Sequence, residues 1–372
     1  MTTTSRFRHL GSRDVSCGTS KPPDHAEFRG LPVPSRGLPQ PRGPLTERLL
    51  GALGRRDPHE LGKNWPIPRG PLDDDGQLAL YCCYELHYRG LPAISDWWEW
   101  EPSLLEFRRT LESRFEEELT EAVGPIETEA DLVVSGLWEL ATSDNGPSLS
   151  AWLLEHGSLD HARELAVHRS AYQLKEADPH TWAIPRLEHD AKAKMVAIQA
   201  GEYGDGVAPA MHAVLFASTM EMLGLDSTYN AYLDHLPGTT LATTNLISFL
   251  GLHRRHRGAL VGHLALFEMT SVGPMGRYAR WMESLGIGPA GLVFYEVHVA
   301  ADEHHQHLAA AMVADLVSRE PELARSVLFG ARALGAVERR FAECILTSWQ
   351  SGRTSLRRCQ TFAPYSSVLG QF

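Results

Sequence analysis

One stretch near the C-terminus, residues 289–317, constrains the fold of this chain most, because a long helical pattern there carries imidazole and carboxylate side chains. Each residue of an α-helix turns by about 100°, so His298, Asp302 and His305 fall on one narrow face that is two turns long. Burying these groups is costly unless a partner satisfies them, and a metal ion is such a partner. The other acidic and imidazole side chains of the stretch are expected on other faces: Glu296, Glu303, His304 and His307.

A solvated, histidine-rich helix face is the alternative that this stretch leaves open. Its apolar flanks, which include Leu292, Val293, Ala301 and Leu308, favour a helix with little exposed surface. We therefore treat the three side chains as candidate metal ligands.

Helical periodicity continues through most of the chain, whereas alternating runs of strand length are scarce. Leu104, Phe107, Leu111 and Phe115 recur at three- and four-residue spacing, and similar patterns follow between Gly, Pro and Asp residues that end and begin helices. The expected helices cover residues 104–119, 130–141, 158–177, 186–202, 208–223, 257–272, 277–285, 289–317 and 321–349. The predicted fold class is all-α, with adjacent helices packed roughly antiparallel.

The chain divides into four predicted regions. Residues 1–44 are poor in large apolar side chains and rich in proline, which predicts a disordered arm containing Pro and Arg residues. A helical extension is expected at residues 45–124 and the main helical domain at residues 125–350. The polar segment 351–372 is predicted to be a loose tail.

Composition limits the partners and the compartment. The formal net charge is −11, which argues against nucleic acid as a partner. No apolar run approaches the roughly 18 residues of a transmembrane helix, and the N-terminus lacks the apolar stretch of a signal peptide. Five cysteines occur without a CxxC spacing, so we expect a cytoplasmic protein with reduced thiols and no membrane association.

Several common motifs fail. Residues 286–291 match GxGxxG, but a helical pattern precedes them where a strand would be needed, so a helix end followed by a helix start is the better interpretation. The chain has no Walker A, HExxH or GxSxG motif, and no Glu-x-x-His pair of the ferritin-like di-iron bundles.

Further candidate ligands lie upstream of the histidine-rich stretch. Glu202 and His212 bracket a turn rich in Gly and Pro, which can bring both side chains to one site. Glu268 and Glu176 each end an apolar or amphipathic run, and buried acids are rare unless they are paired or bound to metal. Glu164 and His168, four residues apart, form a rival pair that spacing alone does not reject.

The order of these residues resembles the ligand pattern of the heme-oxygenase-like diiron oxidases and oxygenases, also called iron-containing redox enzymes, in particular their actinobacterial members. The resemblance covers about residues 132–317, and its most specific parts are Glu-x9-His and His-x3-Asp-x2-His. It implies a heme-oxygenase-like helical bundle at residues 125–350 and a metal site with seven ligands: Glu176, Glu202, His212, Glu268, His298, Asp302 and His305.

The resemblance also implies how two irons would be held. It assigns Glu176, Glu202 and His305 to one iron, and His212, His298 and Asp302 to the other, with Glu202 or Asp302 as a bridge and Glu268 on one iron. Mixed carboxylate and imidazole ligands independently favour iron or manganese.

The implied activity is O2 activation by two ferrous ions, with an electron donor, acting on an amino-acid-like or fatty-acid-like small molecule in specialised metabolism. Seven ligands favour N-oxygenation over desaturation or C–C cleavage within this family. A homodimer is also implied. Two other functions stay open: a non-catalytic helical interaction protein, and an oxidase of the same fold that uses no cofactor.

The substrate pocket can be predicted only in outline. Aromatic residues that could line it are Tyr172, Phe216, Phe267, Phe294 and Tyr295. Arg186 or Arg277 could hold a substrate carboxylate by a two-pronged contact.

Overall fold

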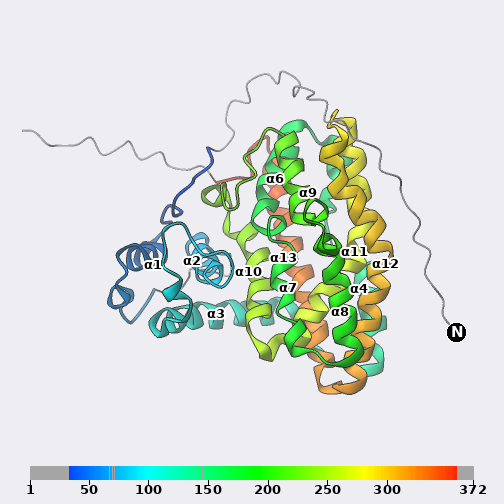
Figure 1. The fold of residues 1–372 in the computed structure, drawn as a ribbon, viewed down its shortest axis with the longest axis horizontal. Helices are drawn as coiled ribbons and strands as arrows, with labels where there is room; N and C mark the ends of the chain where they lie inside the picture. The colour runs from blue at the N-terminus through cyan, green and yellow to red at the C-terminus, as the bar shows by residue number, and fades with distance from the viewer. Residues whose placement is uncertain (1–32, 67, 69, 71, 144–145, 358–372) are drawn as a thin grey trace, which may run out of the picture. The chain divides into compact units, whose positions relative to one another are not determined.

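The computed structural model describes residues 33–66, 68, 70, 72–143 and 146–357, and every regular element within these ranges is a helix (Figure 1). The α-helices are α1 (Pro44–Arg55), α2 (Asp74–Glu85), α3 (Pro102–Val123), α4 (Val133–Thr142), α5 (Leu149–His156), α6 (Leu159–Gln173), α7 (Asp178–Thr181), α8 (His189–Glu202), α9 (His212–Met222), α10 (Gly238–Leu252), α11 (Arg257–Ser284), α12 (Pro289–Arg319) and α13 (Ala324–Gln350). Short 3₁₀ turns, η1 to η9, lie between them. The predicted all-α fold class is therefore confirmed.

The helices α1, α2 and α3 form an N-terminal helical region that packs against the main bundle through α10 and α13 (Figure 1). Asp75 of α2 holds the start of α1, because its carboxylate accepts hydrogen bonds from the backbone N–H of Leu45 and of Thr46 at 2.9 Å. These N–H groups have no partner within their own helix. The carboxylate thus caps α1 from a neighbouring helix.

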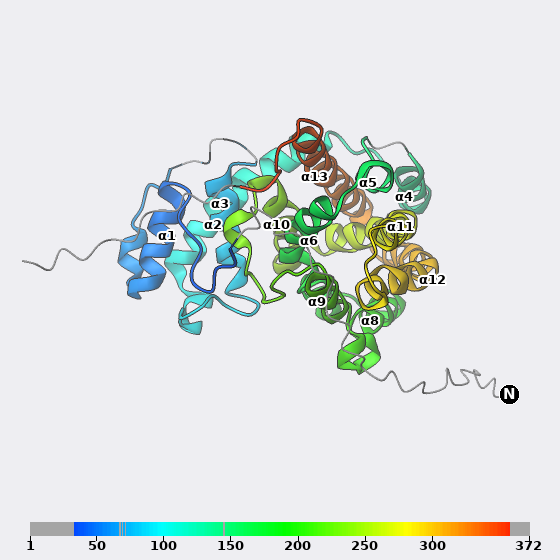
Figure 2. The same ribbon diagram turned by 90° about the horizontal axis from the view of Figure 1, so that it is seen from above.

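The long helix α11 packs along both α12 and α13, and α8 and α9 pack against α12 (Figure 2). Two glycines let α11 and α13 approach closely. A Cβ atom at Gly262 would lie 1.8 Å from the carbonyl oxygen of Val327, and one at Gly330 would lie 1.8 Å from that of Ala259. Any larger residue at either position would force the two helices apart.

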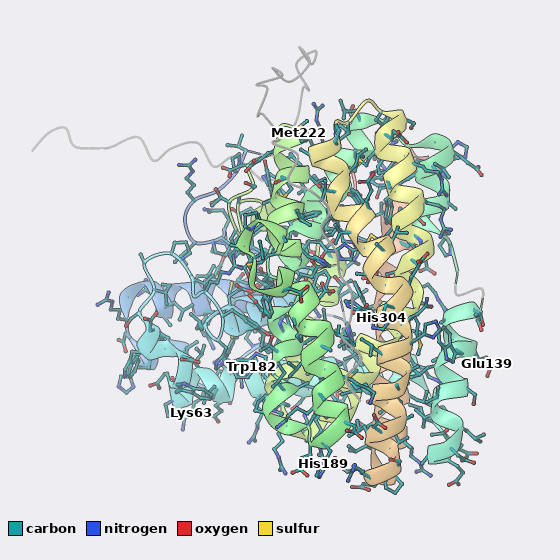
Figure 3. The ribbon with its side chains drawn as sticks, turned by 45° about the vertical axis from the view of Figure 1, so that its right-hand side comes forward. Lys63, Glu139, Trp182, His189, Met222 and His304 are labelled. Atoms are coloured by element: carbon teal, nitrogen blue, oxygen red, sulfur yellow. The ribbon has the colours of Figure 1, made fainter. Side chains whose placement is uncertain are left out.

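Helix α8 runs from His189, and α9 ends at Met222, at the opposite end of the bundle (Figure 3). The turn that joins them therefore lies part-way along the bundle, and both helices pack against α12. This arrangement places the end of α8 and the start of α9 beside the histidine-rich part of α12.

Two helix predictions had wrong boundaries, and one helix was not predicted. The expected helices 257–272 and 277–285 form one helix, α11, which continues through Pro274 because its length packs against α12 and α13. The expected helix 158–177 ends at Gln173, and residues 174–177 form a turn. The sequence analysis did not predict α10, whose residues are buried on nearly all sides and so show no amphipathic period.

Other expectations concern the ends of the chain. Residues 1–32 of the predicted arm and residues 358–372 of the predicted tail lie outside the described residues. Within the tail, the backbone N–H of Ser355 donates to Glu164 at 2.9 Å, and Arg357 pairs with Asp74 at 2.6 Å. Residues 351–357 are thus bound to the bundle, in contrast to the expected loose tail.

The GxGxxG stretch is a helix end followed by a helix start, as predicted: α11 ends at Ser284, Gly286 has a φ of 79°, and α12 begins at Pro289. Within the described part of the chain, no helix has both the length and the hydrophobicity required to cross a membrane.

Candidate metal centre

The structure brings all seven predicted ligand side chains into the interior of the bundle, where each residue is at most 9% exposed. They come from five segments: the turn after α6, the end of α8, the start of α9, the middle of α11 and the middle of α12. In that order the residues are Glu176; Glu202; His212; Glu268; and His298, Asp302 and His305.

The turn between α8 and α9 brings Glu202 and His212 together. Gly204, Asp205 and Gly206 all have positive φ angles, of 63°, 51° and 82°, which reverse the chain direction. A Cβ atom at Gly204 would lie 2.5 Å from the backbone carbon of Ala210, so this position requires glycine. As a result, Nδ1 of His212 lies 2.7 Å from Oε2 of Glu202.

The first group of potential ligands contains Glu176, Glu202, His212 and His298, whose ligand atoms all lie within 4.8 Å of one another. Nδ1 of His298 lies 2.7 Å from the carbonyl oxygen of Phe294, to which it can donate. That hydrogen bond leaves Nε2 facing the centre, 3.2 Å from Oε1 of Glu176. Metal-binding histidines are commonly fixed in this way through their second ring nitrogen.

The second group contains Glu202, Asp302 and His305, again with ligand atoms within 4.8 Å. Nδ1 of His305 lies 3.7 Å from Oε1 of Glu202, 3.8 Å from Oδ1 of Asp302 and 3.5 Å from Oε2 of Glu268. Ser271, one turn after Glu268 on α11, donates a hydrogen bond to Oδ2 of Asp302. Glu268 thus adjoins the second group.

Several of these buried atoms lie close together without hydrogen bonding to one another. Nδ1 of His212, Nδ1 of His305 and Oε2 of Glu176 have no hydrogen-bond partner in the described part of the chain. Leaving buried polar atoms unsatisfied is costly. Lone pairs that converge on a common point without pairing fit a cation, so this donor set suits a bound metal.

The electrostatics of the centre agree with this interpretation. Burial raises the pKa of Glu268 to about 8, and it also raises the pKa of Glu176 and that of Asp302. Burial disfavours the charged form of His298, but Glu176 and the other carboxylates outweigh this effect and raise its pKa to about 10. Burial thus works against the ionised form of these three acids, and bound cations would supply the positive charge that stabilises it.

The grouping differs from the assignment that the resemblance implies. His305 lies with Asp302, and Glu176 lies with His212 and His298. The physical reason is the geometry of α12: Asp302 and His305 are neighbours one turn apart, whereas His298 lies a further turn toward the N-terminus, at the level of Glu176. Glu202 belongs to both groups.

The remaining acidic and imidazole side chains of α12 point to other faces, as predicted. Glu296, Glu303, His304 and His307 are all exposed, and Figure 3 marks His304 on α12. The rival pair is also placed elsewhere: Glu164 accepts from Trp349 at 2.8 Å, and His168 lies 2.7 Å from Oγ1 of Thr240. These partners leave the rival pair no role in the centre.

A small cavity of about 20 Å³ adjoins the predicted ligands and includes two residues that the sequence analysis missed, His180 and Gln199. Burial lowers the pKa of His180 to about 4, and its Nε2 lies 3.1 Å from Nδ1 of His263. Both polar atoms of the Gln199 side chain lack a hydrogen-bond partner in the described residues. Gln199 precedes Glu202 by one helical turn, which is the only sequence signal that could have identified it.

A larger cavity of about 580 Å³ lies beside the centre, and Phe267 lines both cavities. Four of the predicted aromatic residues line the larger one: Phe216, Phe267, Phe294 and Tyr295. Tyr172 lines the smaller cavity. Ser271 lines the larger cavity and contacts Asp302, so the cavity reaches the ligand shell.

Two arginines were candidates for binding a substrate carboxylate. Arg277 lines the larger cavity, and its Nε donates to Ser150 at 2.9 Å. Arg186 does not line either cavity; its guanidinium donates to the backbone carbonyls of Gly251 and Leu252 at the end of α10. Arg186 therefore caps a helix, and the larger cavity offers Arg277 as the candidate.

Comparison with known proteins finds a family match for part of the chain. Residues 163–338 match the family model described as "iron-containing redox enzyme". This segment belongs to the iron-containing redox enzyme family. All seven predicted ligands lie within it, and the resemblance drawn from their spacing is confirmed.

One curated relative of this iron-containing redox enzyme segment is a nitrosourea synthase from Streptomyces achromogenes subsp. streptozoticus. It is 25% identical over 136 residues, which are 37% of this chain and 29% of the relative. The match thus spans less than a third of the relative's length.

Proposed function

We propose that this chain is a non-heme diiron enzyme that activates O2 and oxidises a small, carboxylate-bearing molecule, with N-oxygenation as its reaction. The observation that carries the proposal is the position of Glu202. Its Oε2 atom lies 2.7 Å from His212 in the first group, and its Oε1 atom lies 3.7 Å from His305 in the second. A carboxylate whose two oxygens face two different sets of ligands suits a pair of neighbouring ions.

The donor set fits two ferrous ions. Glu176, His212 and His298 would hold one ion; Asp302, His305 and Glu268 would hold the other; and Glu202 would bridge them. The four carboxylates carry a formal charge of −4, which equals the charge of two ferrous ions in magnitude. Imidazole and carboxylate ligands suit iron or manganese. Two ferrous ions bound here would supply electrons for the reduction of O2.

The larger cavity is the proposed substrate site. Its aromatic wall, which includes Phe216, Phe294 and Tyr295, would contact an apolar part of the substrate and exclude water. Arg277 would bind a carboxylate through its two terminal amino groups, while its Nε donates a hydrogen bond to Ser150. Ser271, which contacts Asp302, lines the same cavity as Arg277, so a substrate held by Arg277 would extend through this cavity toward the centre.

N-oxygenation is supported by the similarity to a protein named for nitrosourea synthesis, because a nitrosourea contains an oxidised nitrogen. Desaturation and C–C cleavage use the same kind of centre and are the alternative outcomes. The substrate would then be an amino-acid-like molecule with a side-chain nitrogen.

Reaction with O2 tests this proposal. Protein loaded anaerobically with ferrous iron would be exposed to O2 with amino acids that carry side-chain amines or guanidines, and with fatty acids. We expect O2 consumption that a chelator abolishes, and an amine product heavier by one or more oxygen atoms in mass spectrometry. Loss of hydrogen or of a carbon fragment would support the alternative reactions.

Two variants on one helix provide the control. His298→Ala is expected to abolish turnover, whereas His304→Ala, at an exposed position of α12, is expected to leave it unchanged. O2 consumption that resists chelation would indicate an oxidase without a cofactor. A protein that binds no iron would instead be a helical interaction protein, and the proposal would be wrong.

A further inference from the structure

Two neighbouring residues of the turn between α6 and α7, Lys175 and Glu176, face different parts of the protein. Glu176 faces the metal centre, where its Oε1 atom lies 3.2 Å from Nε2 of His298. Its neighbour Lys175 faces the N-terminal helical region and forms an ion pair with Glu85 at the end of α2. The turn therefore joins the metal centre to a region outside the residues that match the family.

The Lys175–Glu85 ion pair is buried completely, with both side chains 0% exposed. The Lys175 ammonium lies over the ring of Tyr81 at 5.0 Å and over that of Tyr88 at 4.4 Å. The second oxygen of Glu85 accepts a hydrogen bond from the hydroxyl of Tyr229 at 2.6 Å. A buried ion pair contributes little net stability compared with a well-packed apolar pair, so its specific geometry is the better explanation of its presence.

Arg89 holds the same turn at both ends. Its guanidinium donates to the carbonyl oxygen of Leu174 at 3.0 Å and lies 3.7 Å from the carboxylate of Asp178. Asp178 in turn accepts from the hydroxyl of Tyr203 at 2.9 Å. Tyr203 directly follows Glu202, the carboxylate shared by both groups. The contacts of Arg89 thus extend to the neighbours of two proposed ligands.

We propose that Glu85 and Arg89 are positioning residues of the metal centre: they hold the turn 174–178 in the conformation that directs Glu176 toward the proposed ions. Neither residue touches a proposed ligand. Both lie outside residues 163–338, so the N-terminal helical region completes a site whose ligands all belong to the family segment. This inference rests on the proposed function, because it requires that metal binds at the centre.

The test compares iron binding with folding stability. The double variant Glu85→Leu/Lys175→Met replaces both members of the ion pair with apolar side chains, so that no unpaired charge stays buried. We expect the thermal unfolding midpoint of its metal-free form to stay near that of wild type. We also expect about 10-fold weaker ferrous iron binding, which is the lower end of the range for direct partners of metal ligands, because these residues act one contact further away. The azide-to-iron absorption band of the diferric protein should change as well.

Arg89→Met is the second variant, because the Arg89 side chain is 48% exposed and its loss is tolerated more easily. The same weakening of iron binding is expected. The control is Glu116→Leu/Arg255→Met, which removes a two-pronged ion pair between α3 and η8 (Arg254–His256). That pair also joins the N-terminal helical region to the bundle, but its residues do not adjoin a proposed ligand.

Weakened iron binding in the double variant and Arg89→Met, with unchanged binding in the control, would support the positioning role. Wild-type affinity and an unchanged azide band in the folded double variant, or in Arg89→Met if the double variant does not fold, would overturn it. Equal weakening in the control would also overturn it, since general loosening would then explain the loss. A wild-type protein that binds no iron would instead refute the proposed function, and the positioning role would fall with it.

Discussion

Glu202 and His212 lie at the two ends of one turn, with 2.7 Å between Oε2 and Nδ1, yet Nδ1 of His212 has no hydrogen-bond partner in the described residues. Two buried groups at this distance would ordinarily orient toward each other. Their orientation toward a common point is the geometry of metal ligands. The second oxygen of Glu202, Oε1, has a similar relationship to His305, whose Nδ1 lies 3.7 Å away.

Iron stoichiometry distinguishes a shared ligand from a ligand of one group. Glu202→Ala is expected to lose both irons, because Glu202 belongs to both groups, whereas His305→Ala should retain about one iron per chain. Iron analysis after ferrous loading and desalting measures this difference. The exposed His304→Ala variant is the control, and equal occupancy in Glu202→Ala and His304→Ala would contradict a bridging role.

Substrate affinity tests Arg277. Arg277→Met removes the proposed carboxylate contact, which should cost about 2 to 3 kcal/mol, or a roughly 30-fold to 150-fold loss in kcat/KM. The loss should fall mainly on KM, because the centre itself is unchanged. Steady-state kinetics with an accepted substrate measures it. Arg280→Met, at an exposed position of the same helix outside the cavity, is the control, and a similar loss there would argue against carboxylate binding by Arg277.

Acid stability tests the burial of His168. Burial lowers the pKa of this imidazole to about 3, well below the value of about 6.5 in an unfolded chain. Its contribution to stability is therefore fully present above pH 6.5 and is lost as the pH falls from 6.5 toward 3, because only the unfolded chain takes up the proton. Between pH 7 and pH 5 this amounts to about 2 kcal/mol.

His168→Gln should therefore lose about 2 kcal/mol less than wild type between pH 7 and pH 5. Urea unfolding of the metal-free proteins at both pH values measures the difference. The same substitution at the exposed His304 is the matched control. Parallel losses in wild type and His168→Gln would show that this histidine is not buried in its neutral form.

Glycine-to-alanine substitutions on α11 and α13 should have opposite effects on stability, depending on the space around each glycine. Gly262→Ala should destabilise the protein by about 3 kcal/mol, since its Cβ would lie 1.8 Å from the carbonyl oxygen of Val327. Gly335→Ala on α13 would meet nothing within 4 Å and should stabilise it by about 0.5 to 1 kcal/mol. Thermal or urea unfolding measures both. A neutral Gly262→Ala would mean that the two helices lie farther apart than described.

Much of the fold and of the candidate centre could be predicted from the sequence, because helical period and ligand spacing are local properties. The helical rotation of about 100° per residue is enough to predict that His298, Asp302 and His305 share one face. A turn between two helices is enough to predict that Glu202 and His212 can meet. The family of the segment was recognised from the same spacings.

Features that depend on packing between distant segments could not be predicted. Pro274 indicates a helix end by its local preference, yet packing on α12 and α13 keeps α11 continuous. Three other features depend on how the helices pack against one another. They are the buried position of Gln199, the Lys175–Glu85 ion pair and the division of the ligands into two groups.

The central claim is that two metal ions lie on either side of the Glu202 carboxylate, and anomalous X-ray diffraction at the iron absorption edge tests it most directly. Crystals of protein loaded with ferrous iron without O2 are predicted to show two anomalous peaks, one among Glu176, His212 and His298 and the other beside Asp302 and His305. A single peak, or none within reach of Glu202, would contradict the account.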